Sequence, residues 1–144
     1  MNDMKRLPLY GLAWLALTGV TLFAGRPEAA AQTARVGREF KVKVGRVVML
    51  DGGKLRLRFA RVAEDSRCPV DVDCVWAGSA AVLIEVGGRG WRGKRTLLLN
   101  TNTGEAEAGY ESYTVRLEAL SPQPRSNRKI SQGQYTATLL VTKD

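Results

Sequence analysis

The chain has 144 residues, with 22 lysines and arginines against 14 aspartates and glutamates, which gives a formal net charge of +8. It contains no histidine, and this excludes Cys/His zinc sites and most of the nucleophile–base pairs that hydrolases use. The positive excess favours anionic partners, such as acidic polysaccharide or lipid head groups, but it carries no information about the fold.

The first 31 residues have the pattern of an export signal. Lys5 and Arg6 precede an apolar run over residues 7–25, and a small-residue stretch ends at Ala31. We therefore predict a signal peptide helix over residues 1–31, cleaved after Ala31, and a periplasmic or secreted protein of about 113 residues, the length of one domain. The apolar run is long enough that retention as a membrane anchor is the alternative. Because no cysteine lies near the cleavage site, we expect no lipid anchor.

An alternation of apolar and charged residues begins at Phe40, after a leader over residues 32–38 that we expect to be flexible. The alternation predicts a strand over residues 40–50, with Gly45 as a bulge inside it. Asp51-Gly52-Gly53 predicts a hairpin turn, since tight turns need the positive φ angles that glycine adopts freely. A second strand over residues 54–62 then leads to the two cysteines.

Cys68 and Cys74 are the only cysteines, and five residues separate them. This spacing does not match the Cys-x-x-Cys motif of thiol oxidoreductases or zinc sites. In an exported chain a local disulfide is the simplest interpretation, and a ring of about seven residues would stabilise the fold by roughly 2–2.5 kcal/mol. A metal–thiolate site completed by neighbouring carboxylates is the alternative. Pro69 stiffens the ring by fixing one backbone angle inside it.

Four more strands are predicted beyond the ring, and no stretch has helical periodicity. They cover residues 76–86, where we expect burial on both faces, and residues 91–100, 113–117 and 135–141. We expect polar loops over residues 101–109 and 121–133, the second serving as a crossover or a binding loop. The pattern predicts one all-β domain over residues 39–143, an antiparallel β-sandwich or a small partly open barrel of about six strands.

Two residues near the ring are predicted to be structural. Trp76 lies two positions after Cys74, and we expect its indole to pack on the disulfide in the core. Gly78 is expected to allow a close approach of backbone beside the indole. Trp91 follows a glycine-rich turn and fits either the end of a core strand or an exposed contact tip between two arginines.

The aspartates of this segment are the candidate metal ligands. Asp71 and Asp73 point the same way in an extended segment, and together with Asp65 and the carbonyl groups of the ring they could bind calcium. The other interpretation is that Asp71 and Asp73 are solvated, cap loop amides or pair with Arg67. The pair Asp71 and Asp73 is too close to flank a glycosidic bond, and no phosphate loop or dinucleotide motif is present, so we expect no enzyme and no cofactor.

The first hairpin carries a set of cations that alternation places on one face: Lys54, Arg56 and Arg58. They are a possible anion-binding stripe for an envelope polymer or a membrane surface. The other interpretation is a solvated sheet face whose charges prevent edge-to-edge aggregation. Aromatic residues do not interleave with these cations as they do on nucleic-acid-binding sheets, so we expect no nucleic acid partner.

The segment Asp65-Ser66-Arg67-Cys68-Pro69, followed by Cys74-Val75-Trp76-Ala77-Gly78, resembles a signature of small exported bacterial proteins of unassigned function. The strands predicted over residues 113–117 and 135–141 are similar to the closing half of those proteins. The resemblance implies an exported β-rich domain with a Cys68–Cys74 bridge, and it implies no activity or substrate.

These patterns lead us to expect an exported, monomeric, non-enzymatic β-domain that acts as an envelope-associated binding or structural module. Its partner, unknown from the sequence, would be an anionic envelope component or a secreted protein. Two alternatives remain open, a calcium-stabilised domain of the same fold and a small inhibitor of a secreted hydrolase. An inhibitor would present the disulfide ring or the loop over residues 121–133.

Overall fold

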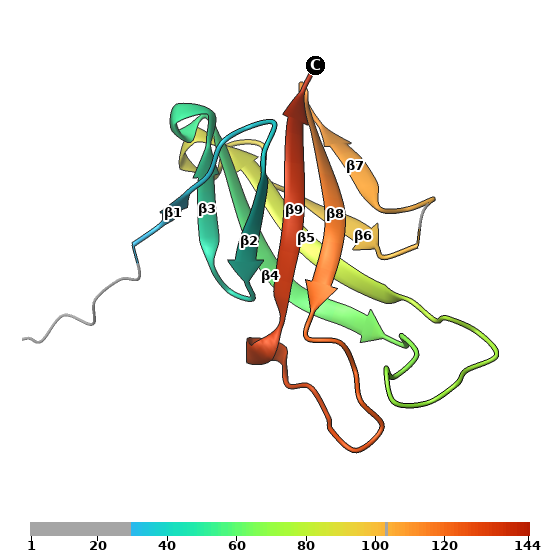
Figure 1. Ribbon diagram of the computed structural model, residues 1–144. Helices are drawn as coiled ribbons and strands as arrows, with labels where there is room; N and C mark the ends of the chain where they lie inside the picture. Colours follow the sequence, from blue (N-terminus) through green and yellow to red (C-terminus); the bar gives the residue numbers. More distant parts are fainter. Residues whose placement is uncertain (1–29, 103) are drawn as a thin grey trace, which may run out of the picture.

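The computed structural model describes residues 30–102 and 104–144. The chain forms two β-sheets that pack face to face (Figure 1). The five-stranded sheet has the order β1-β3-β4-β5-β6, formed by Gln32–Thr33, Val47–Leu50, Leu55–Asp65, Ala80–Gly88 and Arg95–Asn100. The four-stranded sheet has the order β2-β9-β8-β7, formed by Glu39–Lys43, Thr136–Lys143, Tyr113–Ser121 and Glu107–Tyr110. Three 3₁₀ turns complete the fold: η1 (Asp51–Gly53), η2 (Arg89–Trp91) and η3 (Gln132–Gln134).

One core lies between the sheets, and the predicted alternation accounts for it. Leu55, Leu57 and Phe59 of β4 are fully buried, and Leu139 and Val141 of β9 meet them from the other sheet. The charged residues between them point outward, as period-two patterning requires. Of the two predicted architectures, the structure therefore has the β-sandwich, and no closed barrel is present in the part of the chain that it describes.

The predicted bulge at Gly45 is wrong. Gly45 (φ 81°) lies in a tight turn, in which the Arg46 amide donates to the Lys43 carbonyl at 3.0 Å. The chain leaves one sheet at β2 and enters the other at β3 through this turn. The strand predicted over residues 40–50 is therefore two strands in different sheets. A glycine with a positive φ can form a turn between two sheets as well as a bulge within one.

The leader predicted over residues 32–38 contains a short strand, and its flexibility stays a prediction. Gln32 and Thr33 form β1, which pairs in parallel with β3. The Gly37 amide donates to the Val141 carbonyl at 2.7 Å, so the same segment contacts the other sheet. The predicted polar loop over residues 101–109 contains β7, which pairs with β8. β1 and β7 are short strands at the edges of their sheets. Neither has enough residues for an alternation of period two to be recognised in the sequence.

Two strands begin later than predicted. The strand placed over residues 76–86 begins at Ala80, and the strand placed over residues 91–100 begins at Arg95. β5 is not buried on both faces. Its inward residues Ala80, Val82, Ile84 and Val86 are buried, whereas its outward residues Ala81, Leu83 and Glu85 are only half-buried. The segment over residues 121–133 joins the neighbouring strands β8 and β9, so it is not a crossover. The predicted signal peptide helix lies outside the described residues except for its last two positions.

Candidate functional site

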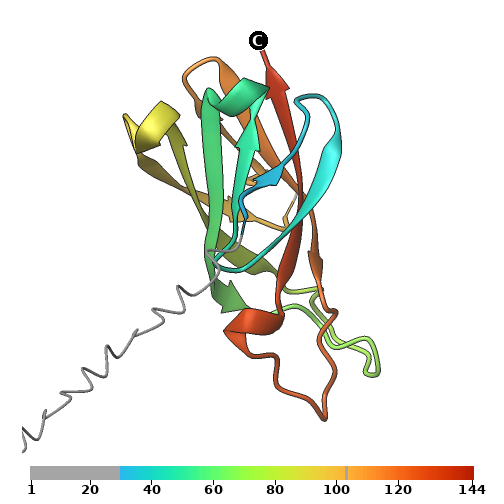
Figure 2. The same ribbon diagram turned by 90° about the vertical axis from the view of Figure 1, so that its left-hand side faces the viewer.

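Two loops project side by side from one end of the sandwich (Figures 1 and 2). One joins β4 to β5 and the other joins β8 to β9. We call residues 66–79 and 122–131 the loop end. The Val70 amide donates to the Pro124 carbonyl at 3.0 Å, and the Ser126 hydroxyl donates to the Asp71 carboxylate at 2.6 Å, so the two loops are bonded to each other. The Ser126 bonds lower the pKa of the Asp71 carboxyl.

The predicted disulfide is confirmed. Cys68 and Cys74 are bonded, with their Cα atoms 5.9 Å apart, and Pro69 lies within the ring. The loop extends the β4–β5 ladder, because the Ser66 amide donates to the Ser79 carbonyl and the Cys68 amide donates to the Ala77 carbonyl, each at 2.8 Å. The residues that lead into and out of the disulfide ring are therefore hydrogen-bonded to each other through their backbones.

Gly78 makes the ladder possible. It has φ 66°, and a Cβ on it would collide with the Ser66 backbone carbonyl. Only glycine combines this backbone angle with so close an approach. The predicted close approach of backbone at Gly78 is thus confirmed, although its neighbour is the strand opposite and not an indole.

An ion pair at the base of the loop end was missed by the sequence interpretation, which offered Arg67 to Asp71 or Asp73. The Arg67 guanidinium instead donates to both carboxylate oxygens of Asp65, at 2.8 and 2.7 Å, and both side chains are about nine-tenths buried. The same guanidinium donates to the backbone carbonyls of Leu120 and Pro122, at 2.7 and 3.0 Å. The Tyr135 hydroxyl donates to Asp65 at 2.9 Å. We call this arrangement the Asp65 clamp, because it joins the ends of β4, β8 and β9.

Burial and ion pairing act against each other in the Asp65 clamp. Burial raises the pKa of the Asp65 carboxyl, but the hydrogen bonds from Arg67 and Tyr135 outweigh it and leave the pKa below its usual value. Burial, together with the Asp65 charge, raises the pKa of Tyr135 to about 12. At neutral pH the clamp therefore consists of a carboxylate, a guanidinium and a neutral phenol.

The prediction that Trp76 packs in the core is wrong. Trp76 is 82% exposed and Val75 is 93% exposed. The core end nearest the loops is already closed by Val62, Leu120 and Tyr135, which are buried. The indole is thus excluded from the core and exposed to solvent on the loop, immediately before the paired residue Ala77. Val70 and Val72, on the same loop, are also exposed.

The structure does not bring the three candidate calcium ligands together. Asp65 is committed to Arg67, and Asp71 to Ser126. Within residues 30–102 and 104–144, no group of three or more acidic or cysteine side chains could hold a metal ion. Asp71 caps the Ser126 amide, as the other interpretation of the sequence allowed, whereas Arg67 pairs with Asp65 and Asp73 is exposed to solvent.

The predicted stripe Lys54, Arg56 and Arg58 lies on one face as expected, but its charge is partly balanced. Arg58 pairs with Glu85 of β5 at 3.4 Å, and Lys94 pairs with the same carboxylate at 2.8 Å. Hydrogen bonding from Lys94, aided by the charges of Lys94 and Arg58, lowers the pKa of the Glu85 carboxyl. Anion binding by this stripe stays a prediction.

Trp91 is half-buried, and neither prediction for it describes its place. Its ring lies over Gly87 on the outer face of the five-stranded sheet, where a Cβ on Gly87 would lie 3.0 Å from the ring. The Lys94 ammonium is 5.8 Å from the ring centroid. Trp91 therefore covers an outer sheet face.

Comparisons with known protein families, with curated proteins and with solved structures find no match for the chain. The likeness of residues 65–78 to small exported bacterial proteins accordingly stays a prediction. Among the described residues, no helix has the length and apolar character needed to cross a membrane. The function is therefore argued from geometry.

Proposed function

We propose that this protein is an exported, non-enzymatic binding domain that docks onto a protein of the cell envelope or its surroundings through the loop end. The observation that carries the proposal is the display of Val75 and Trp76, almost fully exposed, on a loop that three devices brace. These devices are the disulfide, the ladder across Gly78 and the Asp65 clamp.

An exposed indole on a rigid mount is well suited to binding. Tryptophan is enriched among the residues that dominate protein–protein affinity, because it buries a large apolar area and loses little conformational entropy. A loop that is already ordered avoids much of the entropic cost of association. If Trp76 only stabilised the fold, we would expect its indole to be buried.

The charges of the loop end indicate the chemistry of the partner. Arg125, Arg128 and Lys129 are exposed on the neighbouring loop, whereas Asp71 is tied to Ser126. A hollow of about 270 Å³ beside them is lined partly by Pro124 and Ile130. This surface suits a folded protein that offers an apolar pocket for the indole, with acidic groups at its rim.

The proposal also states that the protein is exported. The signal pattern of residues 1–31 predicts it, and a disulfide in a domain of this size is compatible with an oxidising compartment. The absence of histidine and the hydrogen bonds of Asp65 and Asp71 to structural partners support a non-enzymatic role. We also propose that the domain is monomeric.

The proposal is tested by site-specific photo-crosslinking in exporting cells. A photoreactive residue at Val75 is expected to give a discrete adduct with one envelope protein, and the same probe at Leu98, which is 61% exposed on β6, is expected to give none. The purified partner is then titrated with the wild type and with Trp76→Ala and Leu98→Ala. Loss of the Trp76 anchor should weaken binding by about 30-fold or more, while Leu98→Ala should change little. Equal effects of the two substitutions would reject docking through the loop end.

The same geometry favours one second function, inhibition of a secreted hydrolase. The disulfide ring and the β8–β9 loop, the two segments that the sequence offers for this role, lie together and are mutually bonded. If the crosslinked partner is a hydrolase, the wild type should inhibit it with an affinity that Trp76→Ala weakens in parallel with binding. Binding without inhibition would leave only the docking function.

A further inference from the structure

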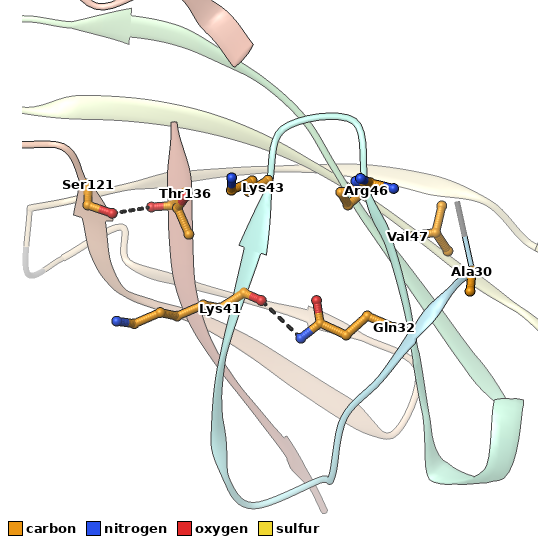
Figure 3. A pocket seen from close by; sticks show the side chains of 8 residues that line it. All are labelled: Ala30, Gln32, Lys41, Lys43, Arg46, Val47, Ser121 and Thr136. Carbon is orange, nitrogen blue, oxygen red and sulfur yellow. Dashed lines mark hydrogen bonds between the residues drawn. The ribbon is translucent and has the colours of Figure 1, made fainter. Parts of the chain in front are cut away.

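A second feature, a hollow, lies away from the loop end, on the edge of the sandwich formed by β1, β2 and β3. It is a hollow of about 640 Å³, within the range of small-molecule sites. Figure 3 shows its lining, which comes from both sheets and shares no residue with the loop end. The lining residues are Gln32, Lys41, Lys43, Arg46, Val47, Ser121 and Thr136, together with Ala30, which the predicted cleavage after Ala31 would remove.

The lining contains three cations and no carboxylate. Lys41 and Lys43 project from β2, and Arg46 follows the turn into β3. Among the described residues, every ion pair involves other cations, so the charges of these three are not balanced by a salt bridge. Glu39 also points outward from β2, but it does not line the hollow.

These cations come from β2 and from the turn that follows it. The Gly45 turn joins Lys43 to Arg46, and Figure 3 shows these two side chains on the two sides of the turn, with Lys41 further along β2. The Gln32 side-chain amide donates to the Lys41 carbonyl at 3.2 Å and so fixes β1 against β2 across the floor (Figure 3). Like charges around one hollow repel one another, and an anion in the hollow would relieve that repulsion.

The remaining polar groups suit a ligand that carries hydroxyls as well as charge. The Ser121 hydroxyl donates to the Thr136 carbonyl at 3.2 Å, which orients it at the rim. The Thr136 hydroxyl and the Gln32 carboxamide oxygen add a donor and an acceptor. Lysine and arginine around neutral hydroxyl and amide groups are the chemistry that recognises a phosphorylated polyol.

We propose that this hollow binds a phosphate ester of about the size of a sugar phosphate, with Lys41, Lys43 and Arg46 on the phosphate and Gln32 and Thr136 on the polyol. The inference is independent of the proposed function, because it rests on different residues. The ligand would be either a free sugar phosphate or the head group of an anionic lipid.

The test is calorimetric titration of the exported protein with inorganic phosphate, glucose 6-phosphate and glucose. We expect saturable binding of glucose 6-phosphate at one site, weaker binding of phosphate and none of glucose. Lys43→Gln with Arg46→Gln should weaken glucose 6-phosphate binding at least about tenfold. The matched control is Arg89→Gln with Arg95→Gln, which removes two positive charges from exposed positions outside the hollow and should leave the affinity unchanged.

Two measurements complete the design. Thermal unfolding of both variants should match the wild type, which shows that lost binding is not lost folding. Co-sedimentation with phosphatidylglycerol vesicles, against phosphatidylcholine vesicles, identifies the source. If the wild type binds the vesicles and only Lys43→Gln with Arg46→Gln loses that binding, the ligand is a lipid head group. If the wild type does not bind the vesicles, the ligand is a free ester. No saturable binding of either phosphate probe, or an equal loss in both double variants, would overturn the proposal.

Discussion

Replacing Asp65 by asparagine is the sharpest test of how the loop end is held. The substitution preserves shape but removes the charge that balances Arg67, whose guanidinium is about nine-tenths buried. Breaking one partner of a buried ion pair costs about 3–5 kcal/mol, because an uncompensated charge is left behind. Arg67 would keep its bonds to the Leu120 and Pro122 carbonyls, so we expect a loss of about 2–4 kcal/mol in the free energy of unfolding.

For a domain of this length, that loss should lower Tm by about 8–16 °C. The control is Arg58→Ala, which removes an ion pair whose arginine is half exposed, and should cost at most about 1 kcal/mol. The pH dependence follows from the lowered pKa of Asp65. The stability that this carboxylate contributes is present above its unfolded pKa of about 3.9 and is lost as pH falls through the folded value. The difference between wild type and Asp65→Asn should therefore persist down to about pH 4 and shrink only below it.

Differential scanning calorimetry measures these effects, and ultraviolet titration adds a local readout. The pKa of Tyr135, about 12 in the wild type, should fall in Asp65→Asn because the neighbouring negative charge is gone, while burial keeps it above 10. Adding Arg67→Met to Asp65→Asn should recover part of the lost stability, since no buried charge then remains. A Tm decrease in Asp65→Asn no larger than that of Arg58→Ala would refute the reasoning.

The remaining predictions concern the ring, the ladder and metal binding. Cys68→Ser with Cys74→Ser should lower the free energy of unfolding by roughly 2–2.5 kcal/mol in denaturant titrations, and no change would mean that the ring does not constrain the unfolded chain. Gly78→Ala should cost at least about 2 kcal/mol in the same assay, because it combines a positive φ with a backbone collision, whereas Gly133→Ala, which faces open space, should cost less than about 1 kcal/mol. Calcium or a chelator should shift Tm by less than about 1 °C, since Asp65 and Asp71 are already engaged, and a large calcium-dependent increase would restore the metal interpretation.

Much of the fold follows from local pattern. Alternation locates β4, β8 and β9 because each is long enough to show a period of two and has one face in the core. Gly45 shows where such reasoning ends, since a glycine that interrupts an alternating run has the same sequence signature whether it makes a bulge or a change of sheet. Sheet order depends on long-range pairing, which composition does not encode.

The site was predicted less well than the fold, and Trp76 shows why. Its spacing from Cys74 is local information, but its burial depends on whether space remains at that end of the core. Tyr135, distant in sequence, closes that end and donates to Asp65. Arg67 was assigned to the aspartates inside the ring, although its partner Asp65 lies only two residues before it. The groups that surround this pair, the Leu120 and Pro122 carbonyls and the Tyr135 hydroxyl, are remote in sequence, and local pattern does not reveal them.

The central claim is that Trp76 is displayed in order to bind. Equilibrium titration of the crosslinked envelope partner with wild type and Trp76→Ala measures this directly. We predict a Kd at least about 30-fold higher for Trp76→Ala, with an unchanged melting temperature, because an indole this exposed contributes little to folding. Equal Kd values for the two proteins, or a melting temperature that collapses when the indole is removed, would contradict the claim.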